Sequence, residues 1–136
     1  MNFDLQTAGN QFAANVENAM AYNQKIGRWG EEMAAAYLQE RGYEIVEKNA
    51  RTPCGEIDVV ARRDGLTVFV EVKTRTSSRF GLPEEAITPR KQAHMLAAAE
   101  HYAAEHEIDS WQADVLAVEG QPGKAPSIEH FENVLA

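Results

Sequence analysis

The chain has one cysteine, Cys54, among its 136 residues. A single cysteine cannot form an internal disulfide, so nothing in the sequence asks for an oxidising compartment. No run approaches the roughly 18 apolar residues that a membrane span needs. The first 20 residues lack the basic start and apolar core of a secretion signal. These absences predict a cytoplasmic protein with no membrane partner.

Basic residues are also scarce: 13 Lys and Arg stand against 21 Asp and Glu, which gives a net charge of −8. This balance counts against a simple nucleic-acid binder, because phosphate contacts favour basic surfaces. The charge is unevenly distributed, however. Residues 1–40 carry 2 basic and 5 acidic side chains, residues 41–91 carry 10 and 8, and residues 92–136 carry 1 and 8. Only the middle segment is net basic, and it holds most of the candidate site.

The length and an apolar fraction of 44% predict a single globular domain. We expect an N-terminal extension over residues 1–22, the domain itself over 23–119, and a C-terminal tail or edge strand over 120–136. Turn residues and periodicity predict the elements of the domain. These are a helix from Asn23 to Arg41 that stops at Gly42, strands over 43–50, 56–62, 67–74 and 111–118, and a second helix from Pro89, capped by Thr88, to about Glu107.

The stretch GEIDVVARRDGLTVFVEVKTR, residues 55–75, predicts a β-hairpin closed by Asp64 and Gly65. Apolar residues occur on both faces of its strands, so we expect a central hairpin that is covered on both sides. That turn would place Asp58 opposite Glu71, and like charges at opposed positions are destabilising. A divalent cation would offset the repulsion, since Mg²⁺ prefers one or two carboxylates with water and phosphate.

Lys73 lies two residues after Glu71 and should project from the same face of its strand. An amine there can hold the attacking water or stabilise the charge that builds up on a phosphate in the transition state. The other face of the hairpin is expected to be apolar and to carry Ile57, Val59, Ala61, Val68, Val70 and Val72.

A helical wheel of the first predicted helix gives one continuous arc of small or apolar residues. Glu31 falls at the edge of this arc, whereas Glu32 falls among polar positions, so Glu31 is the acid expected to reach the sheet. Gly27 and Gly30 lie within the arc and should let the helix approach the strands closely.

Two simpler interpretations stay open. Glu56 opposite Lys73 could form a plain cross-strand ion pair, with Asp58 and Glu71 at a solvated strand end. The four histidines show no helical pair with the four-residue spacing of a zinc site, so they are interpreted as solvated helix residues.

An acid in an early helix, an Asp on one strand and Glu-x-Lys on the next together resemble the PD-(D/E)xK nuclease superfamily. The blocks GRWGEEMAAAYLQERGYEIVEKNAR, GEIDVVA, VFVEVKTRTSSRFG and ITPRKQAHMLAAAEHYA look like the YraN-like family of uncharacterised bacterial proteins. These are predicted endonucleases similar to archaeal Holliday-junction resolvases. The resemblance covers about residues 24–118 and implies an α/β fold. Its core would be restriction-endonuclease-like, αβββαβ, with a mixed central sheet flanked by helices.

The resemblance also implies roles for the residues at matching positions. Asp58 and Glu71 would bind Mg²⁺ or Mn²⁺, Lys73 would be the catalytic lysine, and Glu31 would orient the attacking water. Arg75 and Lys91 match basic positions that could contact phosphates. In one place the chain departs from the family pattern: Gln112 stands where we expect an arginine, two residues before Asp114.

The loop after the hairpin is a further candidate for contact with nucleic acid. It carries Arg75, Arg79, two serines and Phe80, which suit contacts to a phosphate backbone and to bases. A loop that is merely solvated would have the same composition.

The preferred hypothesis is a metal-dependent endonuclease that hydrolyses phosphodiester bonds in DNA, in preference to RNA, with branched or structured DNA as substrate. A junction-cutting enzyme would be expected to act as a symmetric homodimer, because it must make paired incisions. The alternative is a noncatalytic module that keeps the nuclease fold and binds nucleic acid or a protein. The acidic segment 92–136 motivates this alternative, since it repels DNA.

Overall fold

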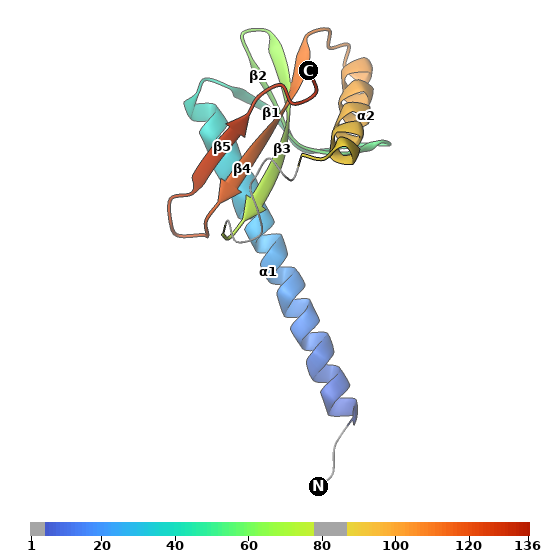
Figure 1. Ribbon diagram of the computed structural model, residues 1–136, viewed down its shortest axis with the longest axis vertical. Coiled ribbons are helices and arrows are strands. Elements are labelled where there is room, and N and C mark those ends of the chain that lie inside the picture. The colour runs from blue at the N-terminus through green and yellow to red at the C-terminus, as the bar shows by residue number, and fades with distance from the viewer. Residues whose placement is uncertain (1–4, 78–86) are drawn as a thin grey trace.

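The structure is a computed structural model that describes residues 5–77 and 87–136. The elements follow the predicted order αβββαβ, with one further strand at the end (Figure 1). They are α1 (Leu5–Glu40), β1 (Glu44–Thr52), β2 (Gly55–Arg63), β3 (Leu66–Arg75), α2 (Pro89–Glu105), β4 (Trp111–Glu119) and β5 (Ser127–Phe131). The predicted α/β class and order are thereby confirmed.

The five strands form one mixed sheet in the order β1-β2-β3-β4-β5. β3 and β4 are parallel, and the other neighbouring pairs are antiparallel. The second half of α1 covers one face of the sheet and α2 covers the other (Figure 1). Each helix buries its own apolar cluster against the central strands, so the hairpin of β2 and β3 is covered on both sides, as predicted.

The hairpin turn confirms the predicted register. Asp64 and Gly65 have φ angles of 52° and 78°, the left-handed conformation that a two-residue hairpin turn needs. The paired residues run from Arg63 opposite Leu66 to Val59 opposite Val70. Asp58 and Glu71 come next along the two strands, immediately beyond the last paired residues. The turn chemistry therefore brings the two acids to the same end of the hairpin.

The predicted apolar face was wrong at one position. Val59 and Ala61 pack on the α1 side, but Ile57 packs on the α2 side with Val60. The alternation of β2 therefore shifts by one residue at Asp58. The neighbouring strand shows the cause: Asn49, between the residues paired with Ile57 and Val59, has a φ of 52°. A left-handed residue interrupts regular pleating, and Asn tolerates this conformation better than most residues.

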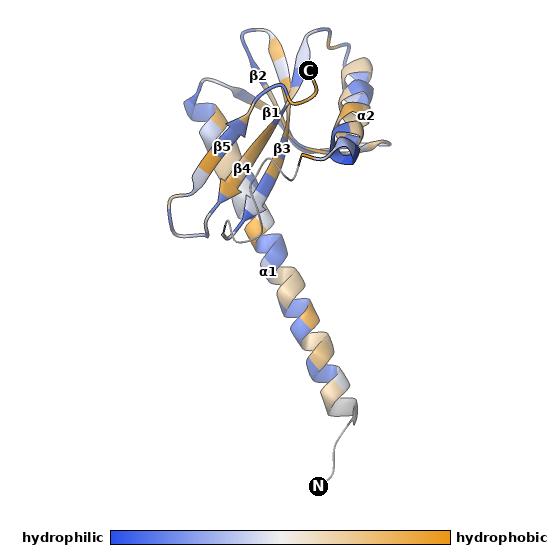
Figure 2. Ribbon diagram, viewed as in Figure 1, coloured by the Kyte–Doolittle hydropathy of each residue, from blue (hydrophilic) through white to orange (hydrophobic). Residues whose placement is uncertain are grey.

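The predicted start of the first helix was also wrong. No break occurs at Asn23, because α1 is continuous from Leu5 to Glu40. Every side chain from Ala8 to Lys25 is exposed, and this half of the helix projects from the body of the protein (Figure 1). Hydrophobic and hydrophilic residues alternate along it (Figure 2). In the part of the chain that the structure describes, no helix is long and apolar enough to cross a membrane.

Where α1 reaches the sheet, one of the two predicted glycine contacts is present. A Cβ atom at Gly30 would collide with the side chain of Thr74 on β3, so only glycine permits this approach. The same prediction for Gly27 was wrong, since a Cβ there would meet no atom within 4 Å. The close approach at Gly30 places the neighbouring Glu31 near the end of the hairpin.

Candidate functional site

Four acidic side chains from three elements gather at the open end of the hairpin. Glu31 comes from α1, Glu56 and Asp58 come from β2, and Glu71 comes from β3. The charges of Glu71, Glu31 and Glu56 each raise the pKa of Asp58, which shows that all three lie within electrostatic reach of it. The structure thus brings together the three acids predicted from the sequence and adds Glu56 to them.

Asp58 lies at the centre of this group and is half-buried. Its Oδ2 accepts a hydrogen bond of 2.8 Å from the backbone N–H of Val72, at a point where the β2–β3 pairing has ended. This hydrogen bond favours the ionised form, but burial opposes it more strongly and the neighbouring acids add repulsion. Together they raise the pKa of Asp58 to about 7. Near neutral pH this carboxylate therefore lacks compensating positive charge.

Glu31 is the second half-buried acid, while Glu32 beside it is exposed, as the helical wheel predicted. Burial raises the pKa of Glu31 and the charge of Glu56 raises it further. A side-chain hydrogen bond with Asn49 lowers the pKa and so favours the carboxylate. The irregular residue of β1 therefore lies beside the helix acid as well as next to the shift in alternation at Asp58.

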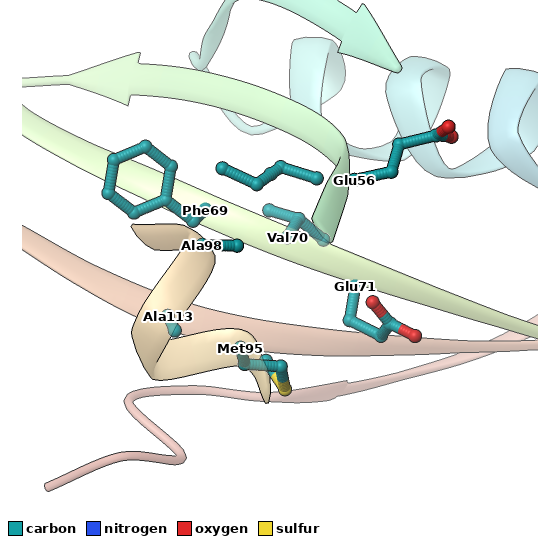
Figure 3. A pocket seen from close by; sticks show the side chains of 8 residues that line it. Glu56, Phe69, Val70, Glu71, Met95, Ala98 and Ala113 are labelled. Atoms are coloured by element: carbon teal, nitrogen blue, oxygen red, sulfur yellow. The ribbon is translucent and has the colours of Figure 1, made fainter. Parts of the chain in front are cut away.

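Glu71 faces α2, where it meets the predicted phosphate-contacting residue Lys91. The Nζ atom of Lys91 lies 2.9 Å from Oε1 of Glu71. Both residues line an open pocket together with Glu56 and His94. Figure 3 shows an adjoining pocket, in which the carboxylates of Glu56 and Glu71 lie across from the Phe69 ring. One end of the pocket is therefore acidic and the other end is apolar.

Lys73 projects from the same side of β3 as Glu71. Val72 packs into the α1 cluster and Thr74 meets Gly30 of α1, so the alternating residues Glu71 and Lys73 point to the other face. Among the described residues, no ion pair joins Lys73 to Glu56. The simple interpretation of these two residues as a cross-strand pair gains no support.

The structure describes only one of the two arginines that were predicted to contact nucleic acid. Arg75 is half-buried at the end of β3 and lines a small pocket with Glu119 and Glu129. Arg79 lies outside the described residues. Their roles in binding nucleic acid stay predictions.

A second polar cluster, the Asp114 cluster, lies between β4 and β5. Asp114 is fully buried and accepts hydrogen bonds from Gln112 Nε2 (2.9 Å), Asn133 N (2.8 Å) and His130 Nε2 (2.7 Å). On its other side the His130 ring contacts Tyr37 of α1. Gln112, which stands where we expected an arginine, therefore acts as a neutral donor to this aspartate.

The sequence interpretation of His130 as a solvated helix residue was wrong. It lies on β5, and its side chain is 11% exposed. Ligand atoms of Asp114, His130 and Glu132 lie within 4.8 Å of one another, close enough for a metal ion. However, the three donors already satisfy the Asp114 carboxylate. A structural role in fastening β5 to the sheet accounts for the cluster without an ion.

Sequence reasoning gave Glu56 and His94 no place in the site. Glu56 belongs to the GEID block, and alternation from Asp58 could have indicated it. His94 lies three residues after Lys91 on a helix, and this spacing places both side chains on one face. The Asp114 cluster had no local signal, because its members lie far apart in the sequence.

The chemistry of the site suits a hard cation. Its four acids offer carboxylate oxygens, the donors that Mg²⁺ and Mn²⁺ prefer, and the open pocket beside them is also lined by His94 and Cys54. It holds an aspartate whose ionisation is opposed by burial and by three neighbouring acids. Two lysines, Lys73 and Lys91, lie on the face where Glu71 points. This arrangement can hold a divalent cation and a phosphate side by side.

Comparison with known proteins places the chain in a family. The model of the uncharacterised protein family UPF0102 matches residues 30–118. A UPF0102 protein of Syntrophotalea carbinolica is 46% identical over 108 residues, which cover 78% of this chain and 87% of that protein. A UPF0102 protein of Dehalococcoides mccartyi is 42% identical over 120 residues, which cover 85% of this chain and 98% of that protein.

Among solved structures, a protein of unknown function, AF1548, is similar with a TM-score of 0.41 and 23% sequence identity. The similarity covers 68% of this chain and 47% of that chain. The family model and the sequence relatives give the assignment. This chain belongs to the uncharacterised protein family UPF0102.

Proposed function

We propose that this protein is a metal-dependent endonuclease that hydrolyses phosphodiester bonds in DNA, with branched or otherwise structured DNA as its substrate. The observation that carries the proposal is the meeting of Glu31, Asp58 and Glu71, from a helix and two strands, at one end of the hairpin. The resemblance to PD-(D/E)xK nucleases gives these same positions, together with Lys73, the catalytic roles.

Asp58 and Glu71 are the residues that would hold Mg²⁺ or Mn²⁺. Their fit rests on charge: burial and repulsion from neighbouring acids raise the pKa of Asp58 to about 7, and added positive charge would favour its ionised form. A divalent cation bound there would polarise the scissile phosphate and lower the pKa of the attacking water.

The other residues have roles that follow from their positions. Glu31, anchored by Asn49, would accept a hydrogen bond from the attacking water and orient it. Lys73 would donate a hydrogen bond to the phosphoryl oxygens as negative charge builds up on them. Phe69, across the pocket from the acids, would limit the access of bulk water (Figure 3).

Lys91 would act in two stages. Its ion pair with Glu71 neutralises that acid in the protein alone. If Glu71 held a cation, the amine of Lys91 would be available for a phosphate oxygen of the substrate. Arg75, at the end of β3, and Arg79 are the proposed contacts to more distant phosphates.

One observation favours the alternative of a noncatalytic module. The ion pair between Lys91 and Glu71 supplies positive charge from within the chain, so the site tolerates its acids in part without any metal. The acidic segment 92–136 would also suit a basic protein partner. In this second function the nuclease fold would bind nucleic acid or protein without cutting.

A cleavage panel tests the proposal. A four-way junction, a flap and a plain duplex are incubated with the wild-type chain, with Lys73→Ala and with Lys124→Ala, which removes an exposed lysine from the turn before β5. We expect Mg²⁺- or Mn²⁺-dependent cutting of a structured substrate by the wild type and Lys124→Ala. Lys73→Ala should lose it. Tight binding measured by gel shift without metal-stimulated cutting would favour the noncatalytic alternative.

A further inference from the structure

The projecting half of α1 carries an apolar stripe that no described residue covers. Phe12, Val16 and Met20 are 71%, 40% and 56% exposed. They are spaced four residues apart, so at 3.6 residues per turn they lie within about 80° of one another on the helix. The rest of the stripe is formed by small residues and one asparagine: Gly9, Ala13, Ala19, Asn23 and Gly27.

The stripe continues the face that α1 buries elsewhere. Further along the same helix, Gly30, Ala34 and Leu38 lie on an overlapping arc and pack against the sheet. A face that is buried from Gly30 to Leu38, about two turns, therefore extends for several more turns beyond the sheet. Most of the stability of a helix comes from tertiary packing of such a face, so an unpacked extension of this length calls for a partner.

We propose that this stripe binds the same stripe of a second copy of the chain, as an antiparallel helix pair centred on Val16. The exposed part of α1 runs from Ala8 to Lys25, so its centre lies between Val16 and Glu17. The three large apolar residues Phe12, Val16 and Met20 are centred on Val16, next to this point. In this pairing Phe12 meets Met20 of the second copy, Val16 meets Val16, and each body lies beyond the opposite end of the pair.

The dimensions agree with this arrangement. At 1.5 Å per residue the exposed segment is about 26 Å long, and an antiparallel pair places the two bodies at its opposite ends. A Cβ atom at Gly27 would meet nothing within 4 Å, so space is open where the first turn of the second helix would lie.

Charge selects a second copy over other occupants. The chain carries a net charge of −8, but residues 5–25 contain only two charged residues, Glu17 and Lys25, so two such segments can meet with little repulsion. Lys25 lies on the face opposite the stripe, and Glu17 lies about 100° from the centre of the stripe, on the flank that it would share with Glu17 of the second copy. The other polar residues are mostly Asn and Gln. A membrane-surface helix would instead need a strongly basic polar face.

Two full-length variants test the pairing. Val16→Asp places a charge at the centre of the stripe, and Ala14→Asp places the same charge on the opposite face two residues earlier. We expect sedimentation equilibrium to give twice the monomer mass of 15.1 kDa for the wild type and Ala14→Asp. Val16→Asp should give the monomer mass, with circular dichroism showing that the body stays folded. A monomeric wild type, or equal masses for both variants, would overturn the proposal.

Cross-linking tests the direction of the pair. In a Cys54→Ser background, Val16→Cys should form an intermolecular disulfide on oxidation. Phe12→Cys should not, because the two copies of residue 12 lie about 12 Å apart along an antiparallel pair. Equal cross-linking at both positions would indicate a parallel pair and contradict the proposal. Binding of a monomer to zwitterionic or anionic vesicles would also contradict it. This inference does not depend on nuclease activity.

Discussion

Asp58 and Asp114 are two aspartates on neighbouring parts of one sheet, and they differ in what surrounds them. Asp114 is fully buried, but three N–H groups donate to its carboxylate. Asp58 is less buried, receives the N–H of Val72 among the described residues, and has three acidic neighbours. Burial alone therefore does not distinguish a structural aspartate from a functional one. The balance of donors and charges differs between the two, and of the two it is the surroundings of Asp58 that would favour a bound cation.

The largest expected effect is the loss of cleavage when the negative charge of Asp58 is removed. Asp58→Asn keeps an oxygen for the Val72 N–H but removes the negative charge, so we expect cleavage to fall by about 10³-fold or more. Asp109→Asn, at an exposed position before β4, should leave cleavage unchanged. Single-turnover rates on the best substrate of the cleavage panel measure the effect. Equal rates for the wild type and Asp58→Asn would end the assignment of a catalytic site to the hairpin.

The next largest effect is the loss of stability when Asp114 is replaced. Asp114→Ala would remove, at a fully buried position, the acceptor of the N–H groups of His130, Gln112 and Asn133. We expect the free energy of unfolding to fall by about 3–5 kcal/mol, as when one partner of a buried charged pair is removed. Urea unfolding measures the change, with Asp109→Ala as the exposed control. A loss below about 1 kcal/mol would show that the cluster is not the structural fastening inferred here.

In the metal-free protein, replacing Asp58 should raise the free energy of unfolding, whereas replacing Asp114 should lower it. Its folded pKa of about 7 lies above its ordinary value of 3.8, so its contribution to stability is fully present below pH 3.8 and is lost as the pH rises through 7. At pH 8, Asp58→Asn should therefore raise the free energy of unfolding by about 2–4 kcal/mol. Near pH 3.5 the difference should vanish. Unfolding curves in EDTA at both pH values measure it, and a destabilised variant at pH 8 would contradict the raised pKa.

The smallest effect concerns the ion pair of Lys91 with Glu71. Both side chains are partly exposed, so this pair should compete with a cation only weakly. We expect Lys91→Ala to strengthen Mn²⁺ binding by up to about fivefold, because surface pairs contribute about 0–1 kcal/mol. The same variant should weaken binding to DNA. Arg90→Ala, at an exposed neighbouring position, is the control. Weaker Mn²⁺ binding by Lys91→Ala would show that Lys91 supports the site instead of competing for Glu71.

Local chemistry made much of the fold predictable. Asp64 and Gly65 determine the hairpin turn, and the turn determines the register that brings Asp58 and Glu71 to one end. Thr88 caps α2 by accepting the N–H of Lys91, as the Thr-Pro sequence predicted. The helical wheel correctly predicted that Glu31 is more buried than Glu32. In each case the signal and the structure lie within a few residues of each other.

The features that sequence reasoning missed depend on distant residues. The shift in alternation at Asp58 comes from Asn49 on the neighbouring strand. The partners of Asp114 come from β4, β5 and the turn after β5, and no period in the sequence joins them. The length of α1 was missed because its side chains from Ala8 to Lys25 are all exposed, so burial gives this part of the sequence no clear pattern.

Isothermal titration with Mn²⁺ tests the central claim most directly, because it asks which of the two aspartates lies in a metal site. The wild type should bind one ion, and Asp58→Asn and Glu71→Gln should each weaken binding at least 100-fold. Glu132→Gln, which alters the Asp114 cluster at an exposed position, should leave binding unchanged. Binding that survives Asp58→Asn but is lost in Glu132→Gln would place the ion between β4 and β5 and contradict the account.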